Sequence, residues 1–135
     1  MKNKEIILNA VQYIENNLKD ELNVLKVSNE VCYSLYHFTR LFQSITGFSP
    51  KKYIQLRRLT EIVHELKNTD NKLSDIAYDY QFGSPETFSR AFKKQFSINP
   101  AEIRKGYSIN NLSLIYPISK DYISHADKVR YKEPE

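Results

Sequence analysis

The chain has few of the residues that cross-link, anchor or interrupt a fold. It contains a single cysteine, Cys32, so no disulfide can form within it and a metal site would lack its usual thiolate cluster. We interpret Cys32 as a small, half-buried apolar residue rather than a redox sensor. No apolar run approaches the ~18 residues of a transmembrane span, and the one near the N-terminus is too interrupted for a signal peptide. These absences predict a soluble, cytoplasmic protein.

The groupings that catalysis needs are missing as well. The histidines, His37, His64 and His125, are dispersed, and no His, Cys and carboxylate cluster has the spacing of metal ligands. Neither a glycine-rich phosphate loop nor a nucleophile motif is present. The sequence therefore predicts that the protein is not an enzyme and carries no metal and no cofactor.

Length and charge narrow the class of protein. The 135 residues suit one domain, or a compact pair of subdomains, and leave no room for a large catalytic domain beside a binding domain. With 20 Lys+Arg against 16 Asp+Glu, the formal charge is +4. This balance is a weak indication of a polyanionic partner.

Helical periodicity dominates the chain, which contains only three glycines and five prolines. Apolar stripes predict helices over about residues 7–18, 24–31, 35–46, 50–67, 73–80, 85–96 and 100–105. Residues that favour N-caps precede most of them, namely Asn23, Ser34, Ser49, Ser84 and Asn99. Proline follows three of these caps, and Glu102 is placed to complete a capping box with Asn99. The pattern predicts an all-α fold.

The C-terminal segment, residues 107–135, has a different character. Leu112, Leu114 and Tyr116 alternate with polar residues, and Pro117 and a charged end follow. This pattern suits an extended segment, but one hairpin's worth of apolar residues cannot sustain a sheet alone. We expect a linker or tail that packs on the helices or pairs with a neighbouring chain.

An internal repeat organises the helical part. An offset of 50 residues superposes the second half on the first; it matches Ser84 with Ser34, Phe88 with Phe38, Arg90 with Arg40, Phe92 with Phe42 and Pro100 with Pro50. Upstream of the turn the offset is 49, so Phe82 matches Tyr33 and Ile76 matches Val27. This duplication is typical of two helix-turn-helix units in tandem, over about residues 24–46 and 73–97.

The outward faces of the repeat favour nucleic acid over a plain helical bundle, although a bundle would explain the phenylalanine stripes equally well. One face carries Tyr36, Thr39, Arg40 and Gln43, and the other carries Glu86, Thr87, Arg90 and Lys94. Such side chains can contact base edges or phosphates. The helix over residues 50–67 would be roughly 27 Å long, which suits two recognition helices near the ~34 Å spacing of successive major grooves. The alternative is a helical protein-interaction module that does not bind DNA.

Specific stretches of the chain resemble a known family. They are Gln81–Ser84, Phe88–Phe96 and Asn99–Pro100, with Tyr33–Ser34, Phe38, Arg40, Phe42, Gly47, Ser49–Pro50 and Tyr53 in the first half. From about Ile7 to Lys105 the chain resembles the DNA-binding domain of the AraC/XylS family of bacterial transcription regulators. The resemblance implies seven helices in two helix-turn-helix subdomains joined by a long helix. It also implies sequence-specific binding of double-stranded DNA by a monomer, and an activator that works with RNA polymerase at the nucleoid.

The resemblance assigns roles to individual residues. The positions that contact bases in the family are occupied by Tyr36, Thr39, Arg40, Pro85, Glu86, Thr87, Ser89 and Arg90, and the outward faces add Gln43 and Lys94. Candidate phosphate contacts are His37, Ser49, Lys51, Lys52, Ser84 and Asn99. Arg40 and Arg90 are the strongest candidates, since arginine can pair bidentately with guanine or hold a phosphate. Pro85 lacks a donor and Glu86 repels phosphate, so the second unit is expected to read fewer bases or to prefer a cytosine amino group.

The chain departs from the family at three positions where the backbone conformation matters. Cys32, Gln81 and Ser97 stand where the family usually has glycine, so a positive φ at any of them would cost of order 1 kcal/mol. Arg57 and Arg58 are expected to form ion pairs within the chain rather than contact DNA.

We expect residues 1–106 to form the DNA-binding domain. Because a small-molecule-binding domain follows it in some members, residues 107–135 are expected to lead to an effector domain outside this chain.

Overall fold

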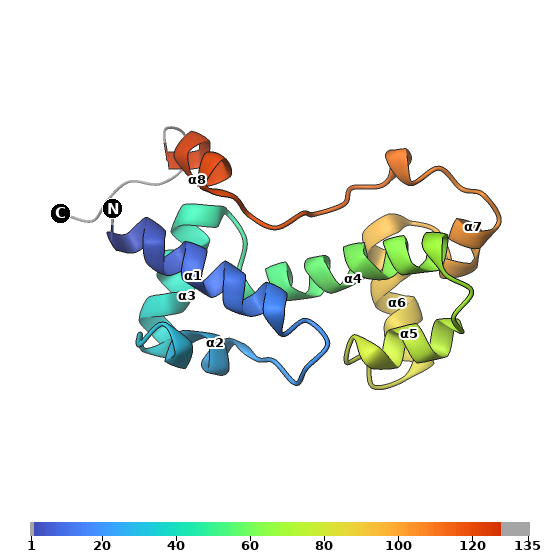
Figure 1. The fold of residues 1–135 in the computed structure, drawn as a ribbon, viewed down its shortest axis with the longest axis horizontal. Helices are drawn as coiled ribbons and strands as arrows, with labels where there is room; N and C mark the ends of the chain where they lie inside the picture. The colour runs from blue at the N-terminus through green and yellow to red at the C-terminus, as the bar shows by residue number, and fades with distance from the viewer. Residues whose placement is uncertain (1, 128–135) are drawn as a thin grey trace. The chain divides into compact units, whose positions relative to one another are not determined.

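The computed structural model describes residues 2–127, and that part of the chain is all-α (Figure 1). Its helices are α1 Lys2–Asn16, α2 Val24–Glu30, α3 Leu35–Thr46, α4 Pro50–Asn68, α5 Leu73–Asp79, α6 Pro85–Phe96, α7 Pro100–Arg104, the 3-10 turn η1 Ile109–Asn111 and α8 Lys120–Asp127. The seven helices implied by the resemblance are confirmed. The eighth, α8, lies where the sequence predicted an extended tail. Residues 128–135 of that tail and the side chain of His125 lie outside the described residues.

The chain divides into two compact units. Of the described residues, the first comprises 2–18, 22–55 and 117–127, and the second comprises 19–21 and 56–116. The first unit therefore holds the α2–α3 pair and the second holds the α5–α6 pair, as the internal repeat predicts. None of the described helices is long and apolar enough to cross a membrane.

Aromatic side chains of α3 form the centre of the first unit's core. Phe38 and Phe42 are fully buried, and the ring centroid of Phe42 lies 5.6 Å from that of Phe38 and 5.5 Å from that of Tyr53. The same unit also buries Ile7, Ala10, Val11 and Ile14 of α1, Val27 of α2, and Leu41 and Ile45 of α3. Each fully buried side chain of this kind contributes about 1.5–3 kcal/mol.

The second unit repeats this arrangement. Phe88, Phe92 and Phe96 of α6 are buried, and successive ring centroids are 5.6 and 4.8 Å apart. The other buried apolar residues of this unit lie on α4, α5 and α7 and include Leu59, Ile62, Val63, Leu66, Ile76, Ala77 and Ile103. The two phenylalanine stripes predicted from the repeat are therefore both core faces.

Side-chain caps begin most of the helices, as predicted. The side-chain oxygens of Asn23, Ser34, Ser49 and Ser84 each accept a hydrogen bond from the backbone N–H three residues later, at 2.8–3.2 Å. The capping box predicted for α7 is wrong, because the side chain of Asn99 makes no cap hydrogen bond. The backbone carbonyl of Asn99 accepts from the Glu102 N–H instead, at 3.0 Å, and the Glu102 carboxylate lies 3.9 Å from the Lys105 ammonium.

The backbone is left-handed at all three positions where the family usually has glycine. Cys32, Gln81 and Ser97 have φ values of 62°, 68° and 63°. Gly47, which ends α3 with φ 83°, is the counterpart of Ser97 in the repeat. L-residues other than glycine pay a cost in this region because Cβ crowds the following carbonyl. The strain expected from the sequence is therefore confirmed.

In the second unit, residues that follow α7 are held along α4. The side chain of Arg57 is 2% exposed, and its guanidinium donates to the Ile115 carbonyl at 2.6 Å and to the Glu61 carboxylate at 3.0 Å. The N–H of Ile115 donates to the Thr60 hydroxyl at 2.9 Å. The ion pair predicted for Arg57 is confirmed, and the hydrogen bonds made by the carbonyl and N–H of Ile115 hold that residue beside α4.

In the first unit, the segment that contains α8 is equally well anchored. The Ile118 N–H donates to the Tyr53 hydroxyl at 3.0 Å, and the Tyr122 hydroxyl donates to the Thr46 carbonyl, at the end of α3, at 2.8 Å. The side chains of Ile118 and Ile123 are buried. The described part of the tail thus packs on the helices, which is one of the two arrangements expected from the sequence.

Candidate nucleic-acid interface

The outward face of α3 carries a linked pair of side chains. Tyr36 is 71% exposed, and its hydroxyl accepts a hydrogen bond from the Arg40 guanidinium at 3.2 Å. The guanidinium carbon also lies 5.5 Å from the Tyr36 ring centroid, within the range of a cation–π contact. Because guanidinium has five N–H donors, this contact orients the Arg40 head and still leaves donors for a ligand.

The other predicted residues of α3 lie along the same stripe. Thr39 is half-buried and Gln43 is exposed, and residues spaced by three, four and seven positions share one face of a helix. His37 is exposed beside this stripe, and its ring stacks on that of Tyr33 with centroids 4.6 Å apart. The structure therefore brings the predicted α3 residues together on one accessible surface.

The outward face of α6 has different chemistry at the matching positions. All six of its predicted contact residues are exposed, namely Pro85, Glu86, Thr87, Ser89, Arg90 and Lys94. Glu86 occupies the position of Tyr36 in the repeat, and within residues 2–127 the side chain of Arg90 has no hydrogen-bond or ion-pair partner. The hydroxyl of Ser84 donates to that of Thr87 at 2.9 Å. Arg90 is thus not held by a neighbour as Arg40 is.

The candidate phosphate contacts fall into two groups. His37, Lys51, Lys52 and Asn99 are exposed side chains. Ser49 and Ser84 are half-buried, and their hydroxyls already accept from the N–H groups of Lys52 and Thr87. At the start of α4, an anion would therefore meet the remaining backbone N–H groups and Lys51 and Lys52 rather than the serine side chain. The start of α6 has no lysine and carries Glu86, so only backbone N–H groups could hold an anion there.

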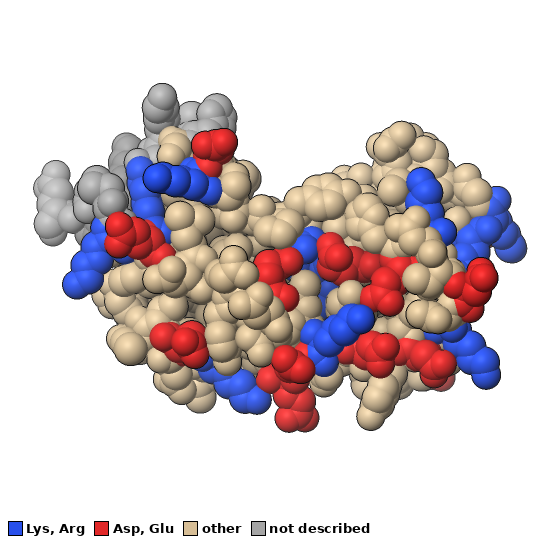
Figure 2. Space-filling view, in the orientation of Figure 1, with Lys and Arg blue, Asp and Glu red and all other residues tan. Residues whose placement is uncertain are grey.

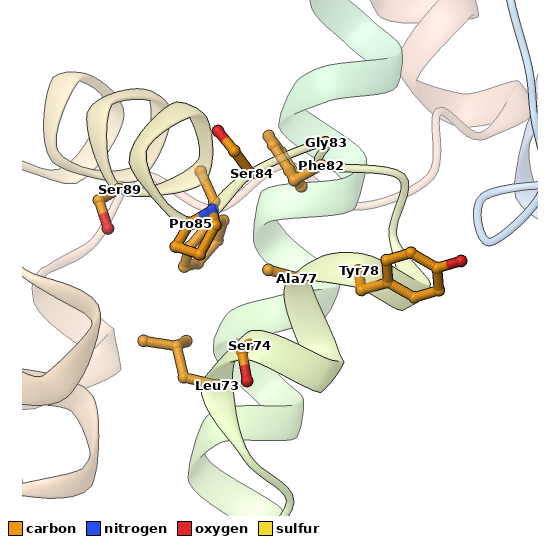
Figure 3. A pocket seen from close by; sticks show the side chains of 10 residues that line it. Leu73, Ser74, Ala77, Tyr78, Phe82, Gly83, Ser84, Pro85 and Ser89 are labelled. Carbon is orange, nitrogen blue, oxygen red and sulfur yellow. The ribbon is translucent and has the colours of Figure 1, made fainter.

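The sequence did not predict a hollow that lies between α5 and the start of α6 (Figure 3). It has a volume of about 400 Å³ and is lined by Leu73, Ser74 and Ala77 of α5 and by Pro85 and Ser89 of α6, among others. None of the lining residues is charged. Two of them, Pro85 and Ser89, are also predicted base contacts, so the hollow borders the outward face of α6.

Arg58 and Tyr80, whose pKa values are shifted, lie on neither of these two helix faces. Burial lowers the pKa of Arg58 from its usual value, and the Asp20 carboxylate partly offsets that change. The Arg58 guanidinium donates to the Asp20 carbonyl at 2.9 Å. Burial and a hydrogen bond with Glu65 raise the pKa of Tyr80 above its usual value. Arg58 is therefore engaged within its own unit, through the backbone carbonyl of Asp20 and the charge of its carboxylate.

The charge distribution does not by itself mark a binding surface. On the face shown in Figure 2, acidic and basic side chains are interspersed, so the net charge of +4 is not collected into a basic patch there. In the described residues, no three His, Cys, Asp or Glu side chains come together in a way that could hold a metal ion. The outward faces of α3 and α6 therefore remain candidates on the chemistry of their side chains, not on net charge.

Comparison with known sequences shows which family has this arrangement. The family described as a helix-turn-helix domain matches residues 27–106. The multiple antibiotic resistance protein MarA of Escherichia coli is 33% identical over 113 residues, which cover 84% of this chain and 89% of MarA. The transcriptional regulator Rob of Salmonella typhimurium is 39% identical over 100 residues, or 74% of this chain but 35% of Rob. The chain thus spans about a third of the length of Rob.

Solved structures agree with the sequence relatives. A transcriptional regulator from Chromobacterium violaceum, described as having an AraC-type DNA-binding domain, superposes with a TM-score of 0.71 and 28% identity over 75% of this chain and 90% of that one. The DNA-binding domain of AdpA, solved in complex with a target DNA, shares the fold with a TM-score of 0.66 and 24% identity over 78% of this chain and 91% of that one. The members of the matched family are regulators rather than enzymes. The chain belongs to the AraC/XylS family of DNA-binding transcription regulators.

Proposed function

We propose that this regulator binds a specific, asymmetric site on double-stranded DNA as a monomer, with α3 and α6 in successive major grooves. The observation that carries the proposal is a feature that α3 and α6 share. Each helix buries phenylalanines at matching positions on one face and exposes a stripe of polar and charged side chains on the other. Packing alone would not require Arg40 and Arg90 to stand at corresponding exposed positions. An exposed arginine on a recognition helix can reach guanine O6 and N7 in the major groove.

The two helices are proposed to read different bases. On α3, Arg40 held by Tyr36 suits guanine or a phosphate, and Thr39 and Gln43 can contact neighbouring bases. On α6, Arg90 suits guanine, and Glu86 can accept a hydrogen bond from a cytosine amino group. Thr87, Ser89 and Lys94 complete that surface. Because the two sets are not alike, the preferred site has two different halves.

Contacts with the DNA backbone would supply much of the affinity. His37, Lys51, Lys52 and Asn99 are proposed phosphate contacts, together with the backbone N–H groups near Ser49 and Ser84. Phosphate contacts position a protein on the duplex and make binding fall steeply with salt. An interaction module that buried only apolar surface would lack this salt dependence.

The wider role is proposed from the relatives. By analogy with Rob, of which the chain covers 35%, we propose that residues 1–106 are the DNA-binding domain, on which residues 117–127 pack, and that the tail leads to an effector domain that binds a small molecule. The chain covers 89% of MarA, so the coverage of Rob does not by itself support this proposal. Transcription activation through RNA polymerase, in the cytoplasm at the nucleoid, is the proposed outcome.

Selection of bound duplexes from a random pool, followed by footprinting, tests the proposal. We expect one asymmetric site of about two helical turns, protected by a monomer. A palindromic site bound only by dimers would contradict the monomeric mode. If selection yields no preferred sequence and binding is insensitive to salt, the result would favour the protein-interaction module.

A further inference from the structure

We propose that the hollow between α5 and α6 receives the 5-methyl group of a thymine in the half-site that α6 reads. This inference rests on the proposed function, because it assigns a particular base to one part of the DNA-binding surface. The hollow has a volume of about 400 Å³, and its walls are made by Leu73, Ala77, Phe82, Pro85 and Phe88, with serine hydroxyls as polar groups.

The position of the hollow points to DNA as its occupant. In a helix-turn-helix unit, the N-terminal residues of the second helix contact base edges in the major groove while the first helix crosses the backbone. Pro85 is the first residue of α6 and Ser89 lies one turn later, whereas Leu73 is the first residue of α5. Figure 3 shows Leu73 and Pro85 facing the same space from the two helices, with Ser89 above it on α6. The hollow is thus continuous with the surface of α6 that carries Arg90.

The chemistry of the walls selects the group that can enter. No lining residue is charged, so a phosphate would meet no counter-charge there. In the major groove, thymine presents an apolar methyl group beside the O4 acceptor. The apolar walls suit the methyl group, and the hydroxyls of Ser74 and Ser89 can donate to an oxygen beside it. Cytosine, which lacks the methyl group, would leave the apolar wall uncovered.

The repeat indicates that this feature belongs to the second unit. Ser74 and Pro85 stand where the first unit has Leu25 and Leu35, whose side chains are 51% and 44% exposed. Ser74 and Pro85 are smaller than these leucines and so leave more room between α5 and the start of α6, although Leu73 is larger than the matching Val24. Pro85, which lacks a side-chain donor, then has a role as an apolar wall of the hollow.

Replacing thymine by deoxyuridine, which removes only the methyl group, tests the inference without altering the protein. After the bound site has been found by selection, each thymine is replaced in turn and the dissociation constant of the full chain is measured. We expect one replacement in the α6 half to weaken binding about fourfold, the value for burying one methyl-sized group. Replacement of thymines outside the site is the control.

Two variants tie the effect to the hollow. In Leu73→Ser, the wall loses its apolar surface, so the deoxyuridine effect should fall to less than about 1.5-fold, while the salt dependence of binding is retained. Val24→Ser alters the matching position in the first unit and should leave the deoxyuridine effect unchanged. Circular dichroism verifies that both variants remain helical.

The outcomes separate this inference from the proposed function. If specific binding persists and Arg90→Ala still weakens it, but no deoxyuridine replacement in the α6 half has an effect, the hollow does not read thymine and is free to bind an apolar ligand or protein segment. An effect that survives unchanged in Leu73→Ser would place the methyl contact elsewhere and overturn the inference. If no duplex is selected at all, the proposed function fails together with it.

Discussion

The two helix-turn-helix units share a buried face and differ on the outward one. Phe38 and Phe42 in the first unit, and Phe88 and Phe92 in the second, are all almost fully buried, and each pair of ring centroids is 5.6 Å apart. Outside, the Tyr36–Arg40 contact of α3 has no equivalent on α6, where Glu86 replaces the tyrosine. Core packing constrains volume and shape, which accounts for the likeness of the two cores, whereas no packing constraint acts on the exposed faces. The proposed reading of different bases by α3 and α6 depends on that difference.

The ends of the two recognition helices show the same contrast in the backbone. Both end in a left-handed residue, which is Gly47 after α3 and Ser97 after α6. Glycine adopts this conformation without steric cost, whereas serine does not. The second unit therefore carries strain that the first unit avoids at this point, although Cys32 and Gln81 show that both turns are strained.

The largest expected effect comes from removing a core phenylalanine. Phe92→Ala should lower the free energy of unfolding by roughly 3–5 kcal/mol, because the buried ring leaves a cavity. Phe42→Ala is the matched variant in the first unit and should cost about as much, since both residues are 0% exposed. Chemical denaturation followed by circular dichroism measures both. A stable Phe92→Ala protein would mean that the inward and outward faces of α6 are wrongly assigned.

The next effect concerns α8, which contacts the first unit. Ile123→Ala should lower stability by roughly 2–5 kcal/mol, since Ile123 is 1% exposed. The exposed neighbour Ser124 offers a control, because Ser124→Ala should change stability by less than about 0.5 kcal/mol. If Ile123→Ala is as stable as the parent, residues 117–127 are a loose linker and do not form part of the first unit.

The arginines should affect binding rather than stability. Arg40→Ala and Arg90→Ala are each expected to weaken specific DNA binding by roughly 1–3 kcal/mol while the unfolding transition is unchanged. Titration of labelled duplex at fixed salt measures the affinities. Tyr36→Phe removes the hydrogen bond to Arg40 but keeps the ring, so it should cost about 1 kcal/mol or less. Full affinity in both arginine variants would remove the basis for the proposed contacts.

The smallest effect is a gain in stability. Ser97→Gly should stabilise the second unit by up to about 1 kcal/mol, because the residue has φ 63° and glycine removes the Cβ crowding. The gain is limited because glycine also makes the unfolded chain more flexible. Gly47→Ser should destabilise the first unit by a similar amount. Thermal unfolding compares the two, and a loss of stability in Ser97→Gly would show that the serine is not strained.

Much of the fold could be predicted because it depends on local chemistry. The spacing of Phe38, Phe42, Phe88 and Phe92 located both buried faces, and the serine caps located helix starts. The failed capping box at Asn99 shows the limit of such rules, since a backbone carbonyl took the N–H that the side chain was expected to bind. Local competition of this kind depends on geometry that a motif does not encode.

Features that depend on distant partners could not be predicted. The segment over α8 has too few apolar residues to signal a helix, and its order depends on Tyr53 and Thr46, which are far away in the sequence. The Arg57 ion pair was expected. The hydrogen bond from the Arg57 guanidinium to the Ile115 carbonyl was not, because it joins residues 58 positions apart. The hollow beside Pro85 depends on how α5 and α6 pack, and that spacing is a tertiary property.

Mapping which base pairs each arginine recognises tests the central claim most directly. The affinity of Arg40→Ala and of Arg90→Ala would be measured on the selected site and on duplexes with every single base pair changed. We predict that each variant loses discrimination at one position, and that the two positions lie in different halves, about one helical turn apart. Loss of discrimination at the same base pair in both variants, or at none, would contradict the account of two recognition helices that read different halves of one site.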